Sequence, residues 1–111
     1  MYTGGRGIAP TGPVSYNSPV EFEWDATKAR SNLAKHGVSF DEAVEAFGDP
    51  LATTYADPDH SHDEVRYLTL ARTTRQRLLV ISHADCGPDC VRIIGARLAT
   101  KKEAHDYHEK T

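Results

Sequence analysis

The stretch LAKHGVSFDEAVEAFGDP, residues 33–50, predicts two helices joined by a very short corner. Gly37 suits the left-handed position that ends a helix, and Val38 suits the apolar contact that often follows such an end. Ser39 and Glu42 have the spacing of a capping box, in which each side chain bonds a free backbone amide of the other residue. The corner is therefore specified residue by residue, and the fold must place a helix on either side of it.

The two helices are expected at about residues 26–36 and 40–47. Asp25 offers an N-cap for the first helix, and Gly48 followed by Pro50 ends the second. Apolar residues recur at helical spacing in both segments, which predicts one buried stripe on each helix. These residues are Ala26, Ala29 and Leu33 in the first helix, and Phe40, Ala43, Val44 and Phe47 in the second.

Five segments have the patterns of β-strands. EFEW alternates charged and aromatic residues, which places Phe22 and Trp24 on one face. The others are LATTYA, VRYLTLAR, RLLVISHA and VRIIGARL, and RLLVISHA is apolar enough to be the central strand. A second capping box, Thr100 with Glu103, begins a last helix that runs to about Lys110. Because the links are short, we expect an α+β fold with a small antiparallel sheet packed by helices, in the order β-α-α-β-β-β-β-α.

Other features of the sequence predict the domain boundaries and the cellular location. Residues 1–20 contain four Gly, three Pro and one charge, so we expect a disordered leader, natural or left over from cloning, before one domain at 21–111. No run of about 18 apolar residues is present, which argues against a membrane span, and no secretory signal is recognisable. These features predict a cytoplasmic protein.

The formal net charge of -3 is unevenly distributed. Residues 21–64 hold eleven acidic and three basic side chains, and residues 65–111 hold nine basic and five acidic ones. The basic second half either marks an anionic partner or consists of solvated strand and turn positions.

The two cysteines lie in the turn CGPDC. In a reducing cytosol we expect Cys86 and Cys90 to be free thiols, although the turn also permits a disulfide. Together with His60 and His62 they offer the ligand types of zinc, but the HSH segment lies in an acidic loop, so we expect no metal site.

Several basic and other polar side chains lie on or near the predicted strands. Arg66, Arg92 and Arg97 fall on strands, Arg75 and Arg77 at the mouth of one, His83 in the central strand and Tyr107 on the last helix. Cleavage of RNA without a metal requires a base for the 2′-hydroxyl, cations for the phosphate and an acid for the leaving oxygen, and these side chains can divide those roles.

Three blocks carry a family resemblance: FEWDATKARSNLAKHGVSFDEAVEAFGDP, RLLVISHAD and VRIIGARLATKKEAHDYHE. They resemble the BrnT family of toxins from bacterial type II toxin–antitoxin systems, which is similar to the RelE-like ribonuclease toxins. The resemblance implies an endoribonuclease that arrests growth by cutting RNA. It also implies inhibition by a cognate antitoxin of the BrnA type, a ribbon-helix-helix protein that alone contacts operator DNA.

The family's charged and polar signature falls on Lys28, Asn32, Lys35, His36, Arg92, Arg97, Glu103 and Tyr107. We assign the catalytic roles to Arg97, Arg92, His83, Tyr107 and His36, with Arg97 expected to matter most. We assign RNA binding to Lys28, Lys35, Arg66, Arg75 and Arg77, and no residue to a metal or cofactor.

Each residue of this set also has a structural interpretation. The lysines can solvate a helix, His36 can cap one, and Tyr107 can pack in the core. Arg92 and Arg97 are five residues apart and would face opposite sides of a regular strand, unless Gly95 marks a bulge. One of the two arginines can also be an ion-pair partner of Glu103 or Asp49.

Three functions therefore remain open from the sequence. The first is a metal-independent endoribonuclease toxin, the second a non-catalytic module that binds an antitoxin as co-repressor, and the third a small zinc-binding domain.

Overall fold

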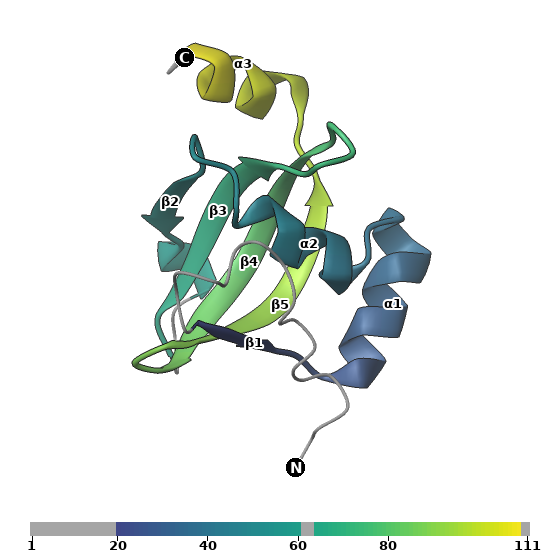
Figure 1. The fold of residues 1–111 in the computed structure, drawn as a ribbon, viewed down its shortest axis with the longest axis vertical. Helices are drawn as coiled ribbons and strands as arrows, with labels where there is room; N and C mark the ends of the chain where they lie inside the picture. The colour runs from purple at the N-terminus through teal and green to yellow at the C-terminus, as the bar shows by residue number, and fades with distance from the viewer. Residues whose placement is uncertain (1–19, 61–63, 110–111) are drawn as a thin grey trace.

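Residues 20–60 and 64–109 are described by the computed structural model, and they form one five-stranded sheet with helices against it (Figure 1). The strands are β1 (Glu21–Glu23), β2 (Thr53–Ala56), β3 (Arg66–Arg72), β4 (Leu78–Gly87) and β5 (Cys90–Leu98). The helices are α1 (Ala26–His36), α2 (Phe40–Ala46), the 3-10 helix η3 (Pro58–His60) and α3 (Lys101–Glu109). The predicted order of α-helices and strands is confirmed. The expected leader lies outside the described residues, except for Val20.

The strand order across the sheet is β1-β5-β4-β3-β2, so the apolar strand β4 is central as predicted. Strands β2 to β5 pair antiparallel, in agreement with their short connections. Strand β1 differs, because it pairs with β5 in parallel. Two α-helices, the 3-10 helix and three strands separate β1 from β5 along the chain, so the short-link argument did not apply to this pair. No helix among the described residues is long and apolar enough to span a membrane.

A β-bulge interrupts the pairing of β4 with β5. Ser82 pairs with Gly95 while its neighbour His83 pairs with Ile93, which leaves Ile94 as an extra residue on β5. One extra residue reverses the alternation of side chains along a strand. Ile93 and Ala96, three residues apart, accordingly both lie in the core. The bulge that the sequence allowed at Gly95 is present one residue earlier, at Ile94, and it turns Arg92 and Arg97 to the same face.

The main core lies between the sheet and α2, which crosses the face of the sheet in Figure 1. Its aromatic members are Phe22, Trp24 and Phe40, and the Trp24 and Phe40 rings meet edge to face with centroids 5.8 Å apart. The predicted stripe on α2 packs into this core. The predicted stripe on α1 holds only at Ala29, which is partly buried against this core. It is wrong at Ala26, which is exposed, and at Leu33, whose side chain is 51% exposed.

Helix α1 lies beside the edge of β5 rather than on the sheet face (Figure 1), and Asn32 attaches it there. Its Oδ1 accepts a hydrogen bond from the Ala96 amide at 3.1 Å, and its Nδ2 donates to the Ala96 carbonyl at 2.8 Å. Nδ2 also donates to the carbonyl of Val38 at 3.0 Å. The side-chain amide thus pairs with the strand edge as another peptide group would, which gives this signature residue a structural role.

The corner between α1 and α2 matches the sequence prediction in its backbone. Gly37 has φ +71° and donates its amide to the carbonyl of Leu33 at 2.9 Å. Ser39 Oγ accepts from the Glu42 amide at 3.1 Å. The reciprocal half of the first capping box is wrong, because the Glu42 carboxylate bonds Thr73 and Arg77 instead.

The second box is complete. Glu103 Oε1 accepts from the Thr100 amide at 2.8 Å, and Thr100 Oγ1 accepts from the Glu103 amide at 3.1 Å.

Replacing Gly37 by valine is expected to lower the free energy of unfolding by about 1 kcal/mol or more, since a β-branched residue resists positive φ. A Cβ added at Gly37 would have nothing within 4 Å, so the cost comes from the backbone and not from a clash. Chemical denaturation measures the effect. Gly37→Asn is the matched control, because asparagine tolerates this conformation. Equal stability of the valine variant and the wild type would contradict the capping assignment.

Candidate active site

The sheet has a second face, turned away from α2, which we call the open face. Directly paired residues of neighbouring strands point to the same face of a sheet, so the strand register places a set of side chains together on the open face. These residues are Tyr55, Arg66, Leu68, Arg92 and Arg97. Helix α3 covers one end of the open face by packing Tyr107 against Leu70 and Val80. Tyr55, by contrast, remains 43% exposed.

Arg66 and Arg92 lie on either side of the same β4 residue. Both pair with Ala84, one from β3 and the other from β5, so their side chains leave the open face in one row. The carboxylate of Glu64 joins them. Its Oε1 accepts a hydrogen bond from Nη2 of Arg92, and its Oε2 lies 3.7 Å from Nε of Arg66. We call Glu64, Arg66 and Arg92 the Glu64 cluster.

The three side chains of the Glu64 cluster are between 31% and 37% exposed, so they are ordered by their contacts and still open to a ligand. Two guanidinium groups around a carboxylate supply donors for a phosphate together with an acceptor for a proton. Sequence reasoning missed Glu64, which appeared there as one more acid of a loop. Its position directly before the strand that carries Arg66 was the available signal.

Arg97 lies at the other end of the open face, opposite Val80. It is four β4 residues from the row of Arg92, a distance of about 13 Å along a strand. Its guanidinium bonds both carboxylate oxygens of Glu103, at 2.9 and 3.0 Å. The Arg97 hydrogen bonds lower the pKa of Glu103 to about 2, against the opposing effect of burial. The ion pair with Glu103, one of the structural interpretations of Arg97, is confirmed.

A groove of about 610 Å³ lies beside this pair, between β2 and α3. Three carboxylates line it, and the groove also includes Tyr55; the lining residues are Thr53, Tyr55, Leu70, Glu103, Asp106 and Glu109. The pKa of the Tyr55 hydroxyl is raised, first by burial and then by the charge of Glu103. Such a groove repels a phosphate, which makes the Glu64 cluster the better anion site on this face.

Tyr107 is buried, and its hydroxyl donates to Oδ2 of Asp49 at 2.6 Å. Asp49 also accepts from the Arg72 amide at 2.8 Å, and the Arg72 guanidinium lies 5.4 Å from the centre of the Tyr107 ring. Burial opposes ionisation of Asp49, but these hydrogen bonds hold its pKa below the ordinary value. The packing interpretation of Tyr107 is confirmed.

His83 lies on the face covered by α2, opposite to the three arginines. Its ring stacks on Tyr67 at 5.8 Å and meets Phe47 edge to face at 5.1 Å. Nε2 shares a hydrogen bond of 2.7 Å with the hydroxyl of Thr69. Burial lowers the pKa of His83, against the charge of Asp85. The structure does not bring His83 together with the Glu64 cluster.

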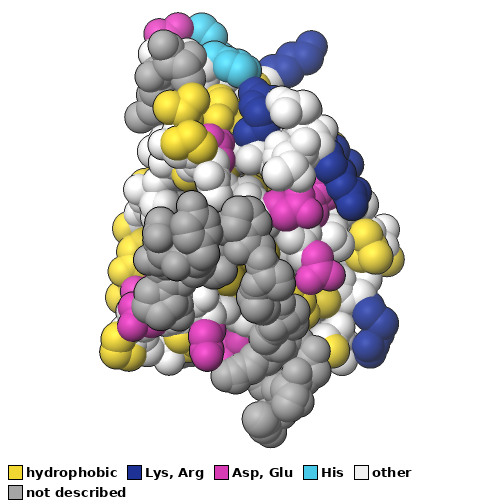
Figure 2. All heavy atoms as spheres, viewed as in Figure 1, with side chains coloured by type: hydrophobic (Ala, Val, Ile, Leu, Met, Phe, Trp, Pro, Cys, Tyr) yellow, Lys and Arg dark blue, Asp and Glu magenta, His cyan; other side chains and the backbone are white. Residues whose placement is uncertain are grey.

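The other predicted site residues lie apart from that cluster. Arg77 bonds Glu42 at 2.7 and 3.0 Å and the carbonyl of Gly37 at 2.9 Å, so it ties the helix corner to β4. Lys28, Lys35 and His36 are exposed on α1, and Arg75 is exposed in the β3–β4 turn. Figure 2 shows the helix-covered face, with Lys and Arg side chains along the side of α1 and acidic side chains nearer the middle.

The expectation of two free cysteine thiols is wrong. Cys86 and Cys90 form a disulfide across the β4–β5 hairpin, with Cα atoms 5.0 Å apart, and are not free thiols. The two strands hold the ends of a four-residue separation within disulfide reach. Of the histidines considered as zinc ligands, His62 and the side chain of His60 lie outside the described parts of the chain.

Comparisons with known proteins agree with this architecture. Residues 24–103 match a protein family described as "Ribonuclease toxin, BrnT, of type II toxin-antitoxin system". A similar solved structure is the crystal structure of the Brucella abortus ribonuclease toxin BrnT, with a TM-score of 0.54 and 19% identity, covering 70% of this chain and 94% of that one. No curated protein matches the chain. The family match spans more than half of the chain, so this protein belongs to the BrnT family of ribonuclease toxins of type II toxin–antitoxin systems.

Proposed function

We propose that this toxin cleaves RNA without a metal ion and that the Glu64 cluster is its reactive centre. The observation that carries the proposal is the row of Arg66 and Arg92 on an accessible sheet face, with the Glu64 carboxylate held between them. A phosphate bound here meets two cations, and the carboxylate beside it can take up a proton.

In this mechanism the 2′-hydroxyl of the RNA attacks the adjacent phosphorus, and Glu64 accepts the hydroxyl proton. Charge then develops on the phosphate oxygens, where the two guanidiniums stabilise it. The bond to the 5′-oxygen breaks, and water at the open face protonates that oxygen. The products are a 2′,3′-cyclic phosphate and a 5′-hydroxyl end. His83 and Tyr107 contribute to the core in this scheme.

Chelation tests the absence of a metal, and Arg92→Ala tests the site. We expect cleavage of a defined RNA to survive EDTA. We expect Arg92→Ala to lose about a hundredfold in rate, as is typical when one donor to a developing oxyanion is removed. Arg30→Ala is the matched control, since Arg30 is an exposed arginine on α1 with a bond only to Thr27 among the described residues. Activity abolished by EDTA and restored by a divalent ion would overturn the mechanism.

We further propose that Arg97 contacts a neighbouring phosphate of the bound strand, because it shares the open face with the Glu64 cluster. Arg97→Ala is then expected to lower cleavage about tenfold, the value of one charge-assisted bond. Glu103→Ala removes the same ion pair but leaves the guanidinium. Because it also removes the capping bond to the Thr100 amide, it is expected to lower stability at least as much while keeping activity. Similar activity losses in the two variants would show that Arg97 only supports the fold.

Lys28 and Lys35 are proposed contacts for flanking phosphates. They lie on α1, which follows the edge of β5, the strand that carries Arg92.

We also propose that a cognate antitoxin of the BrnA type, a ribbon-helix-helix protein, inhibits the toxin in the cytoplasm, where its RNA substrate is found. Membership in a type II family supports this partner. Co-purification of the two proteins, with loss of RNA cleavage in the complex, is the expected result. Operator DNA should shift with the complex and not with the toxin alone. A folded toxin that binds the antitoxin and cleaves no RNA would favour the co-repressor function instead.

A further inference from the structure

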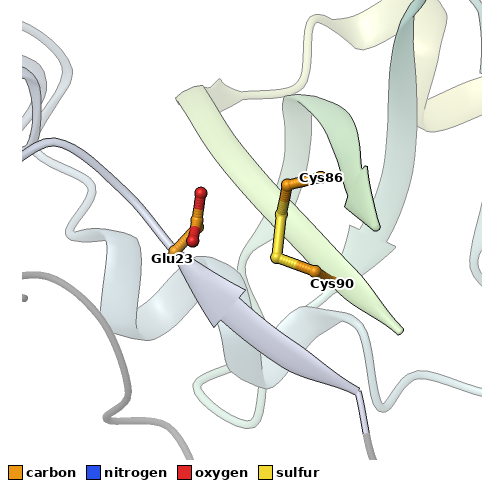
Figure 3. Close-up of side chains that lie close together, drawn as sticks. All are labelled: Glu23, Cys86 and Cys90. Atoms are coloured by element: carbon orange, nitrogen blue, oxygen red, sulfur yellow. A yellow bond between two sulfur atoms is a disulfide. The ribbon is translucent and has the colours of Figure 1, made fainter. Parts of the chain in front are cut away.

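Three potential metal ligands meet where β1 joins the β4–β5 hairpin. Glu23 comes from β1, and Cys86 and Cys90 come from the two strands of the hairpin (Figure 3). One ligand atom from each residue lies within 4.8 Å of the other two. The parallel pairing of β1 with β5 sets this proximity, because Glu21 is the register partner of Cys90 and Glu23 points to the same side two residues later.

The Glu23 carboxylate stands next to the sulfur atoms without an ion pair or hydrogen bond to any described residue. All three side chains are partly buried. A half-buried carboxylate is normally paired, so one that has no partner within residues 20–60 and 64–109 and lies beside two sulfurs is available as a ligand.

We propose that Glu23, Cys86 and Cys90 bind Zn²⁺ once a thiol reductant has opened the disulfide. Two equivalents of the thiol reduce the S–S bond, form their own disulfide and leave two cysteine thiols. Zn²⁺ then replaces the two thiol protons and takes the carboxylate as third ligand, with water in the fourth position. Two thiolates and one carboxylate are ligands that zinc commonly takes in proteins.

The present arrangement is close to what a tetrahedral site needs. Zinc–sulfur bonds of about 2.3 Å and zinc–oxygen bonds of about 2.1 Å place tetrahedral ligand atoms roughly 3.5 to 3.8 Å apart. The carboxylate is already within 4.8 Å of the sulfurs, so it moves by about an ångström. The two sulfurs separate from their bond, which rotation about the Cys side chains provides without moving either strand.

The zinc ligands share no residue with the Glu64 cluster, although Glu23 is the register partner of Arg92. The zinc titration therefore tests this proposal independently of the RNA cleavage assays.

The test uses the full chain, reduced with a phosphine that is then removed without air. Zn²⁺ is titrated in competition with a chromophoric chelator, and Cd²⁺ reports its thiolate bonds through their ultraviolet charge-transfer band. We expect one Zn²⁺ per reduced chain and none for the oxidised chain. Glu23→Gln should weaken zinc binding at least tenfold. Removing a residue that only hydrogen-bonds a metal ligand already costs about tenfold or more in affinity.

Glu21→Gln is the matched control, since Glu21 is a carboxylate of the same strand outside the ligand group, and it should bind zinc as the wild type does. Glu23→Gln keeps both cysteines and so keeps the disulfide available in the oxidised state. The proposal is overturned if the reduced wild type fails to take zinc from the chelator. Equal affinities of Glu23→Gln and wild type would overturn it as well.

Discussion

Replacing Glu64 by glutamine is expected to lower the rate of RNA cleavage by about a hundredfold to ten-thousandfold, the range for loss of a general base. Glutamine has nearly the same size as glutamate and keeps an oxygen toward the two arginines, but it cannot take up the proton of the 2′-hydroxyl. Arg66 and Arg92 remain in place, so RNA binding should persist. The loss is therefore expected in kcat and not in KM.

Single-turnover cleavage of a labelled oligonucleotide, together with a binding titration, separates the two effects. Glu109→Gln is the control, because Glu109 is a 65% exposed carboxylate on α3, away from the cluster. Two results would remove Glu64 from the mechanism. One is a glutamine variant with wild-type kcat, and the other is a loss of activity that follows a loss of folding in circular dichroism.

Replacing Glu42 by alanine is expected to destabilise the fold by about 1 to 3 kcal/mol, the usual cost of leaving a buried hydrogen-bond donor without its acceptor. The Glu42 side chain is 2% exposed and accepts hydrogen bonds from Arg77 and from the buried hydroxyl of Thr73. Without it, these donors lose their acceptor, and α2 loses its buried attachment to the β3–β4 turn. Urea unfolding at neutral pH measures the effect.

The same pair makes stability depend on pH. Hydrogen bonding from Arg77 lowers the pKa of Glu42 below its ordinary value, against the effect of burial. A carboxyl group with a lowered pKa in the folded state stabilises above its unfolded pKa of about 4.5, and this stability is lost as the pH falls through the folded pKa. Glu42→Gln should lack this part of the acid dependence.

Glu45→Ala controls for the Glu42 experiments. Glu45 is exposed on the same helix, and its carboxylate accepts a hydrogen bond from the exposed Thr74 hydroxyl at 2.8 Å, so losing this side chain should cost less than about 1 kcal/mol. Equal losses of stability in the two alanine variants would contradict a special role of the buried Glu42 carboxylate.

The sequence alone determined the features that depend on neighbours along the chain. The Gly37 stop, the Ser39 cap and the full Thr100–Glu103 box are local, because a helix end needs partners within about four residues. The order of elements followed from the periodicity of apolar residues, and the family followed from short motifs. Among the candidate residues, the sequence also named both arginines of the Glu64 cluster.

Tertiary structure decided everything that depends on contacts between distant segments. Glu42 had a local partner in Ser39, yet it bonds Arg77, 35 residues away, because that donor is charged and reaches the same buried site. Leu33 follows a helical stripe, yet it is exposed because α1 lies at a sheet edge. No periodicity reports which elements a helix will meet.

The site shows the same division. One extra residue at Ile94 turns Arg92 and Arg97 to one face, and the register of three strands brings Arg66 level with Arg92. Glu64 meets both arginines of the proposed reactive centre only because its carboxylate reaches across β4 to Arg92, 28 residues further along the chain. The sequence gives the chemistry of each side chain. The face that a strand residue occupies changes with a single inserted residue, so it is determined only when the strands pair.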